Sequence, residues 1–162
     1  MTGIFYGSTT GHTEAVAGQL ARLLGLSDHD IYNVGCCSAA AAEAYDVLLL
    51  GSSTWGAGDV QDDWYDFLDQ LSAQDLRGKK VALFGCGDSE SYPDTFCGAL
   101  AQLYDRLQPT GCTFVGFCEP GGDFLPESDV LRDGHLLGLT LDDNTPERHE
   151  AQLAAWCEHL LA

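Results

Sequence analysis

The segment 8-STTGHT-13 is the first stretch whose residue types suggest chemistry, because it carries four hydroxyl groups, a glycine and an imidazole before a long amphipathic stretch. Hydroxyls and unpaired backbone N–H groups at the start of a helix form an anion-binding loop. The segment lacks the lysine and spacing of a nucleoside-triphosphate loop, and it does not match GxGxxG. It therefore predicts a terminal phosphate held by hydrogen bonds rather than by a cation. The alternative for the hydroxyls is simple helix capping, which needs only one of them. His12 is either a weak cation at the phosphate or merely an exposed residue.

Two further loops each set an aromatic residue among small or polar ones. In 51-GSSTWGAGDVQ-61 a tryptophan follows a buried-type apolar run, and in 85-GCGDSESYPDTFC-97 a tyrosine stands seven residues after the first glycine. Trp55 and Tyr92 could form two plates for a planar ligand. The alternatives are a partly buried core tryptophan and an ordinary loop tyrosine.

The elements that must position these loops alternate along the chain. Five near-continuous apolar or β-branched runs are typical of parallel strands covered on both faces, and they lie at 2–6, 30–34, 46–51, 80–85 and 112–117. Amphipathic patterns predict helices at 13–26, 60–71, 94–107 and 146–161, with a short helix at 39–44. The first helix is expected to bury Val16, Leu20, Leu23 and Leu24.

This alternation predicts an α/β fold, a three-layer, doubly wound, five-stranded parallel sheet. Right-handed crossovers and the strand number favour the order 2-1-3-4-5, which brings the loops after strands 1, 3 and 4 together at the ligand-binding edge. The segment 118–135 is rich in Gly, Pro and Asp, and strand-like residues resume at 135–141. We interpret it as an insertion in the last strand.

Length, cysteine content and net charge indicate which kind of protein this is. The 162 residues suit a single soluble domain, 1–162, with no membrane span, and the lack of a visible secretory signal makes the cytoplasm the expected location. The seven cysteines have neither disulfide-framework nor metal-site spacing, so we expect reduced thiols and no metal. A net charge of −18 disfavours nucleic acid and anionic membrane surfaces as partners and favours a basic protein partner. A generally acidic surface is the alternative.

A planar aromatic ligand with one phosphate, held between an indole and a phenol ring, is FMN. The segments GSTTGHTE, SSTWGAGDVQDDW and LFGCGDSESYPDTF closely resemble the long-chain flavodoxins, as does the insertion near 118–135, and the resemblance runs from Ile4 to the last helix. It implies the flavodoxin-like fold and non-covalently bound FMN. Carried over residue by residue, it implies phosphate binding by Ser8, Thr9, Thr10, Gly11, His12 and Thr13, stacking by Trp55 and Tyr92, and a ring lined by Ser53, Thr54, Gly56, Ala57, Gly58, Cys86, Gly87, Asp88 and Cys97.

The resemblance also implies a function. A flavodoxin is a low-potential one-electron carrier, not an enzyme, and it cycles mainly between semiquinone and hydroquinone. The peptide Gly56–Ala57 is expected to rotate so that its carbonyl accepts the N5 proton of the semiquinone, a motion that glycine allows. The acids Asp59, Asp62, Asp63, Asp66 and Asp69 would face a basic partner such as a flavodoxin/ferredoxin-NADP reductase or another oxidoreductase, and the protein is expected to be a monomer.

The alternative function is an FMN-dependent NAD(P)H:quinone reductase-like enzyme, which would need a nicotinamide and quinone site beside the flavin. The chain has no obvious extra element to build one. A receiver domain would need acids after strands 1 and 3, and a phosphatase of similar topology would need Cys-x5-Arg; the sequence has neither.

Overall fold

The computed structural model describes residues 1–55, 58–120 and 128–161. Its strands and α-helices are β1 (Thr2–Gly7), α1 (His12–Leu24), β2 (Ile31–Asn33), β3 (Val47–Trp55), β4 (Asp59–Val60), α2 (Trp64–Ser72), β5 (Lys80–Gly87), α3 (Ala99–Leu107), β6 (Thr113–Val115), β7 (Leu131–Arg132), β8 (His135–Leu136), β9 (Leu139–Asp142) and α4 (His149–Leu161). Short 3-10 turns occupy Asp28–Asp30, Ala39–Ala44, Pro93–Thr95, Gln108–Thr110 and Pro146–Arg148.

The sheet has the strand order β2-β1-β3-β5-β6, and every pairing along this path is parallel. The fifth position is shared by two strands: β6 pairs with the first half of β5, and β9 pairs with its second half. The interruption between β6 and β9 contains the two-stranded β7–β8 hairpin. This confirms the predicted order 2-1-3-4-5 and the insertion in the last strand; residues 121–127 of that insertion lie outside the described residues.

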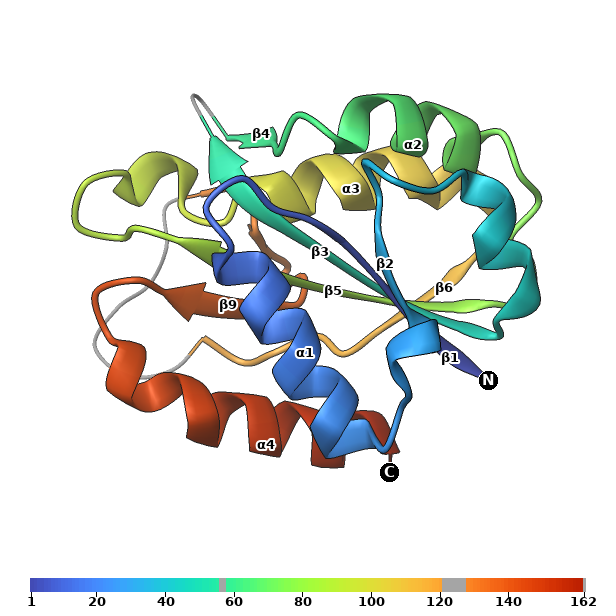
Figure 1. Ribbon diagram of the computed structural model, residues 1–162. Helices are drawn as coiled ribbons and strands as arrows, with labels where there is room; N and C mark the ends of the chain where they lie inside the picture. Colours follow the sequence, from blue (N-terminus) through green and yellow to red (C-terminus); the bar gives the residue numbers. More distant parts are fainter. Residues whose placement is uncertain (56–57, 121–127, 162) are drawn as a thin grey trace.

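Helices cover both faces of the sheet, with α1 and α4 on one face and α2 and α3 on the other (Figure 1). Side chains alternate between the two layers, as the period of a strand requires. Phe5 packs with Trp64 and Phe67 of α2, whereas its neighbours Ile4 and Tyr6 pack in the layer under α1 and α4. The carboxyl ends of β1, β3 and β5 meet at one edge, so the loops that follow them are neighbours (Figure 1).

Some local expectations are wrong. Leu23 does not join the buried stripe of α1, because 48% of it is exposed and the stripe is completed by Ala17 and Ala21 instead. The strand predicted at 46–51 continues to Trp55, where its end pairs with the two-residue strand β4. The helix predicted from residue 94 begins at Ala99, after a separate 3-10 turn at Pro93–Thr95.

Among the helices of the described part of the chain, none has the length and apolar character that a membrane crossing requires.

Candidate functional site

A cavity of about 350 Å³ opens at the sheet edge where β1, β3 and β5 end. Its size lies within the range of small-molecule sites. Ten of the residues predicted for the ligand line it: Thr10, His12, Ser53, Thr54, Trp55, Cys86, Gly87, Asp88, Tyr92 and Cys97. Thr95, Phe96 and Asp143 complete the described lining, and sequence reasoning did not single them out.

The loop between β1 and α1 is built around Gly11, which adopts a left-handed conformation with φ of 90° and precedes the first helical residue. Such a φ favours glycine, because it has no Cβ to clash. No side chain caps α1. The Ser8 hydroxyl instead accepts a bond of 3.0 Å from the Gly11 N–H, and the Thr9 hydroxyl accepts one of 3.0 Å from Gln61 Nε2. The bonds given for Ser8 and Thr9 do not cap α1, and Thr10 and His12 bring the start of the helix to the cavity. The N–H groups of a helix's first turn have no partner within the helix.

Thr13, in the first turn of α1, is fully buried, yet its hydroxyl makes no well-formed hydrogen bond among the described residues. It lies near enough to the Cys86 thiol to oppose the rise in the pKa of that group. A buried hydroxyl without a partner costs free energy in the folded protein, so its retention calls for an explanation such as a ligand. The hydroxyl stands where the helix dipole favours an anion.

The two predicted aromatic plates line the same cavity and are unusually open to solvent. Trp55 is 43% exposed and Tyr92 is 62% exposed. The indole Nε1 of Trp55 donates to Ser53 Oγ at 2.8 Å, which fixes the ring relative to the end of β3. Among the described residues, the Tyr92 side chain has neither a hydrogen bond of this kind nor a contact with another ring. Large exposed aromatic groups at the mouth of a cavity are available to a planar ligand.

The end of β5 and the loop after it bring two thiols to the cavity. Cys86, at the end of the buried strand, is 5% exposed, and burial raises the pKa of its thiol to about 12. Cys97 is fully buried with a positive φ of 50°, its Sγ faces the Gly85 carbonyl, and burial raises its pKa well above the usual value. Both groups are neutral at pH 7. They add sulfur to the lining and no charge.

Two carboxylates, those of Asp88 and Asp143, also line the cavity. Asp88 accepts bonds from Glu90 N, Ser91 N and Asn144 Nδ2, the last of which contributes most to lowering its pKa. The pKa of Asp143 is raised, first by desolvation and then by the neighbouring Asp88 charge, while His12 opposes the rise. The rim nearest Asp143 is therefore acidic, and His12 and His149 are basic groups close enough to act on it.

The other predicted residues fall into three groups. Ser8, Thr9 and Gly11 shape the first loop, and Thr13 lies beneath it. Gly58 has a positive φ of 97° after Trp55 but does not line the cavity. Gly56 and Ala57 lie outside the described residues. Asp143 was missed because only the register of β9 beside β5 carries its turn to the cavity; Asp142 is the partner of Gly87 in that ladder.

A larger cavity, of about 630 Å³, lies between α4, β9 and residues 117–120. Among the described lining residues the two cavities share only Phe96, and the larger one contains none of the residues predicted for the ligand. Within the described ranges no three or more His, Cys, Asp or Glu side chains are grouped to hold a metal ion, and all seven cysteines are free thiols.

Known proteins match this chain along nearly its whole length. The family model described as Flavodoxin matches residues 4–156. Flavodoxin 1 of Escherichia coli K12 is 41% identical over 162 residues, which cover 99% of this chain and 92% of the relative. The flavodoxin of Haemophilus influenzae is 40% identical, with 99% and 93% covered.

A solved structure agrees with these sequence relatives. The crystal structure of the Fusobacterium nucleatum flavodoxin bound to flavin mononucleotide superposes with a TM-score of 0.89 at 27% identity, and the match covers 99% of this chain and 96% of that one. The fold, the cavity at the carboxyl ends of β1, β3 and β5, and the full-length relatives lead to one conclusion: the chain belongs to the flavodoxin family, as one of its long-chain members.

Proposed function

We propose that residues 1–162 form one FMN-binding domain, and that the 350 Å³ cavity holds the cofactor non-covalently. As a flavodoxin, the protein is an electron carrier and not an enzyme. The observation that carries the assignment is the meeting of Trp55, Tyr92 and the open start of α1 at a single cavity, with the Thr13 hydroxyl buried and unpartnered beside it. Two exposed rings fit a planar tricycle, and the helix start fits its phosphate.

The phosphate would be held by neutral donors. Thr10 and His12 line the cavity, and the Thr13 hydroxyl supplies a donor whose contact with the Cys86 thiol is weak. The first-turn N–H groups of α1 add further donors, and the helix dipole offsets part of the anionic charge. Ser8 and Thr9 act indirectly, because their hydroxyls accept bonds that hold the loop.

The ring would lie between Trp55 and Tyr92, over Ser53, Thr54, Cys86, Gly87 and Cys97. Bound FMN supplies the one-electron redox chemistry. The protein sets how readily the ring accepts negative charge. The apolar floor with its neutral thiols disfavours charge by desolvation, and the Asp88 carboxylate opposes it by repulsion. A carboxylate at ~10 Å contributes only about 0.4 kcal/mol in water, so repulsion is one contribution among several to a low potential.

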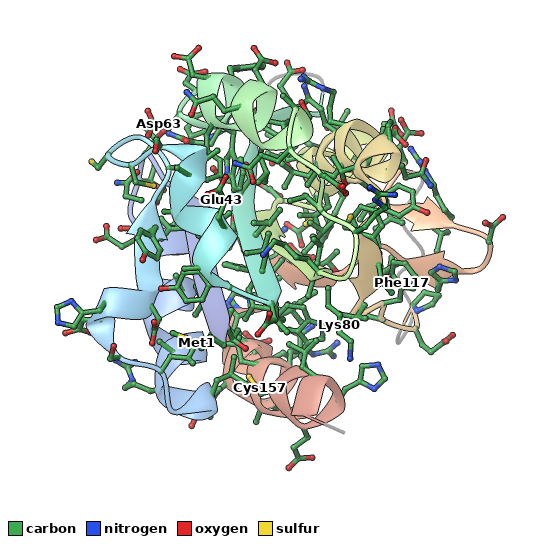
Figure 2. The ribbon with its side chains drawn as sticks, turned by 90° about the vertical axis from the view of Figure 1, so that its right-hand side faces the viewer. Met1, Glu43, Asp63, Lys80, Phe117 and Cys157 are labelled. Carbon is green, nitrogen blue, oxygen red and sulfur yellow. The ribbon has the colours of Figure 1, made fainter. Side chains whose placement is uncertain are left out.

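The flavodoxin family implies redox partner proteins, and we propose that the partner's docking face is basic. The five acids after the Trp55 loop, namely Asp59, Asp62, Asp63, Asp66 and Asp69, are all exposed. Figure 2 shows Asp63 beside α2 near the top of the view, while Met1 and Lys80 lie lower down, where β1 and β5 begin. Asp69 is partly neutralised, because Arg106 contacts it at 2.6 Å. The other four would attract a partner such as a flavodoxin/ferredoxin-NADP reductase and speed the encounter.

An anaerobic spectroscopic redox titration of the purified protein tests the proposal. A yellow protein that takes up electrons in two separated one-electron steps is expected. A colourless protein that does not bind added FMN would overturn it. Steady NAD(P)H oxidation by the protein alone would contradict the carrier function.

A further inference from the structure

The loop of residues 88–92, called here the Tyr92 loop, delivers one aromatic plate but does not hold it by its ring. Tyr92 is 62% exposed and makes no ring contact among the described residues. Its backbone N–H donates to the Asp88 carbonyl at 2.9 Å, and its carbonyl accepts from Thr95 N at 3.3 Å. The position of the phenol ring therefore depends on where the loop backbone is anchored.

The loop is anchored from a distant part of the chain. Asn144 Nδ2 donates to Asp88 Oδ1 and to Asp142 Oδ1, at 2.9 Å in each case. Ser89 donates to the Asp142 carboxylate through both its N–H and its hydroxyl. We call these contacts of Asp142 and Asn144 with Asp88 and Ser89 the tether. It joins segments more than 50 residues apart in sequence.

The sheet places the tether. Asp142 is the last residue of β9 and pairs in register with Gly87, the last residue of β5. One residue later, Asp143 N donates to the Gly87 carbonyl at 2.8 Å. The turn after β9 is thus fixed beside the turn after β5 by main-chain bonds, and the side chains of Asp142 and Asn144 reach the Tyr92 loop from a rigid base.

Charge makes the Asn144 amide important. At Asp142 burial raises the pKa but the hydrogen bonds together outweigh it, and at Asp88 hydrogen bonds lower the pKa, so two ionised carboxylates meet here at neutral pH. The Asn144 Nδ2 donor lies between them and satisfies both. Without it the carboxylates would repel each other, and the Tyr92 loop could move away from the turn.

We propose that Asn144 and Asp142 are positioning residues, which hold the Tyr92 loop where its tyrosine packs on the flavin ring. Neither residue lines the FMN cavity, so both act through the loop. This inference rests on the proposed FMN site and adds to it the device that orders one wall.

A double-mutant cycle on the FMN-loaded protein tests the proposal. Asn144→Ala is expected to weaken FMN binding about three- to tenfold, the equivalent of one or two hydrogen bonds, and to shift the potential of the first one-electron step. Tyr92→Ala weakens binding by itself. In the Tyr92→Ala background, Asn144→Ala should cost almost nothing further, because the tether then has no ring to place.

Gln108→Ala is the matched control. It removes an exposed amide that donates to the Tyr104 hydroxyl at 2.9 Å, away from the cavity, and should leave both FMN affinity and potential unchanged. Unaltered FMN binding in Asn144→Ala, or equal losses with and without Tyr92, would overturn the tether. Asp142→Asn retains one of the two oxygen acceptors that Ser89 uses and should have a smaller effect than Asp142→Ala.

Hydrogen exchange separates failure of the tether from failure of the proposed function. In the FMN-free protein, Asn144→Ala should speed exchange at the amides of Ser89, Ser91 and Tyr92, and Gln108→Ala should not. If the wild-type protein binds no FMN, the proposed function fails, and this measurement still tests whether the tether holds the loop. Unchanged exchange rates at those amides would refute it.

Discussion

Thr13→Val should change the stability of the FMN-free protein and the affinity for FMN in opposite senses. The Thr13 hydroxyl is buried without a well-formed hydrogen bond, and an unsatisfied group of this kind costs about 1–3 kcal/mol. Valine has nearly the same shape and removes that cost, although a weak contact with the Cys86 thiol is also lost. We expect a gain of about 1 kcal/mol in the free energy of unfolding, or about 2–4 °C in Tm for a chain of 162 residues.

The effect on binding has the opposite sign. A hydrogen bond to a charged group contributes about 1.5–3 kcal/mol, so losing the bond from Thr13 to the phosphate should weaken FMN binding about ten- to hundredfold. Quenching of FMN fluorescence measures this affinity, and thermal unfolding with and without FMN measures both effects in one experiment. Riboflavin, which lacks the phosphate, should bind the variant and the wild-type protein equally well.

Thr110→Val is the control of opposite character. Thr110 is also buried, but its hydroxyl donates to the Leu107 carbonyl. Its loss should destabilise the FMN-free protein and leave FMN affinity unchanged. Thr13→Ser retains the hydroxyl and should bind FMN nearly as well as the wild-type protein. The reasoning is refuted if Thr13→Val binds FMN as tightly as the wild-type protein, or if it destabilises the FMN-free protein as Thr110→Val does.

Three further outcomes are expected. Burial raises the pKa of Cys86 to about 12, above that of a thiol in the unfolded chain. As the pH rises the unfolded state therefore loses its proton first, and the free energy of unfolding measured in urea titrations should fall above about pH 9. A free energy of unfolding that stays constant from about pH 8 to 10 would contradict this. Tyr92→Ala should increase the fluorescence of bound FMN and weaken its binding by about 1 kcal/mol or more, whereas unchanged fluorescence would argue against stacking. Asp62→Asn combined with Asp66→Asn should slow association with a basic reductase in stopped-flow measurements at low salt. Asp75→Asn, whose carboxylate already pairs with Arg77, should not. An association rate of the double variant equal to that of the wild-type protein would exclude steering by these two carboxylates.

The layered fold could be predicted because a strand buried on both faces has apolar residues at successive positions, and this is visible in the sequence. The run Val47–Leu50 is apolar at successive positions, since Leu48 and Leu50 pack in one layer and Leu49 in the other. Once the strand order follows, the loops that carry Thr10, Trp55 and Tyr92 must meet at one edge. That part of the site required no knowledge of side-chain geometry.

What could not be predicted depends on pairing between distant segments. The tripeptide Asp142-Asp143-Asn144 looks like an ordinary polar turn, and only the register of β9 with β5 gives it a place beside Gly87. Leu23 was expected in the core because it fits a helical period. Small residues of α1 are buried in its place, and a hydrophobicity pattern gives alanine too little weight to show this.

The strands at the two edges of the sheet are short, which protects the protein against edge-to-edge aggregation. β2 has three residues, and on the opposite side β6 and β9 have three and four, divided by the insertion. A long, straight outer strand can recruit the same strand of another molecule and begin aggregation, and short or broken borders prevent this. The described sheet therefore gives a second copy little to extend, which suits a carrier that diffuses between partners.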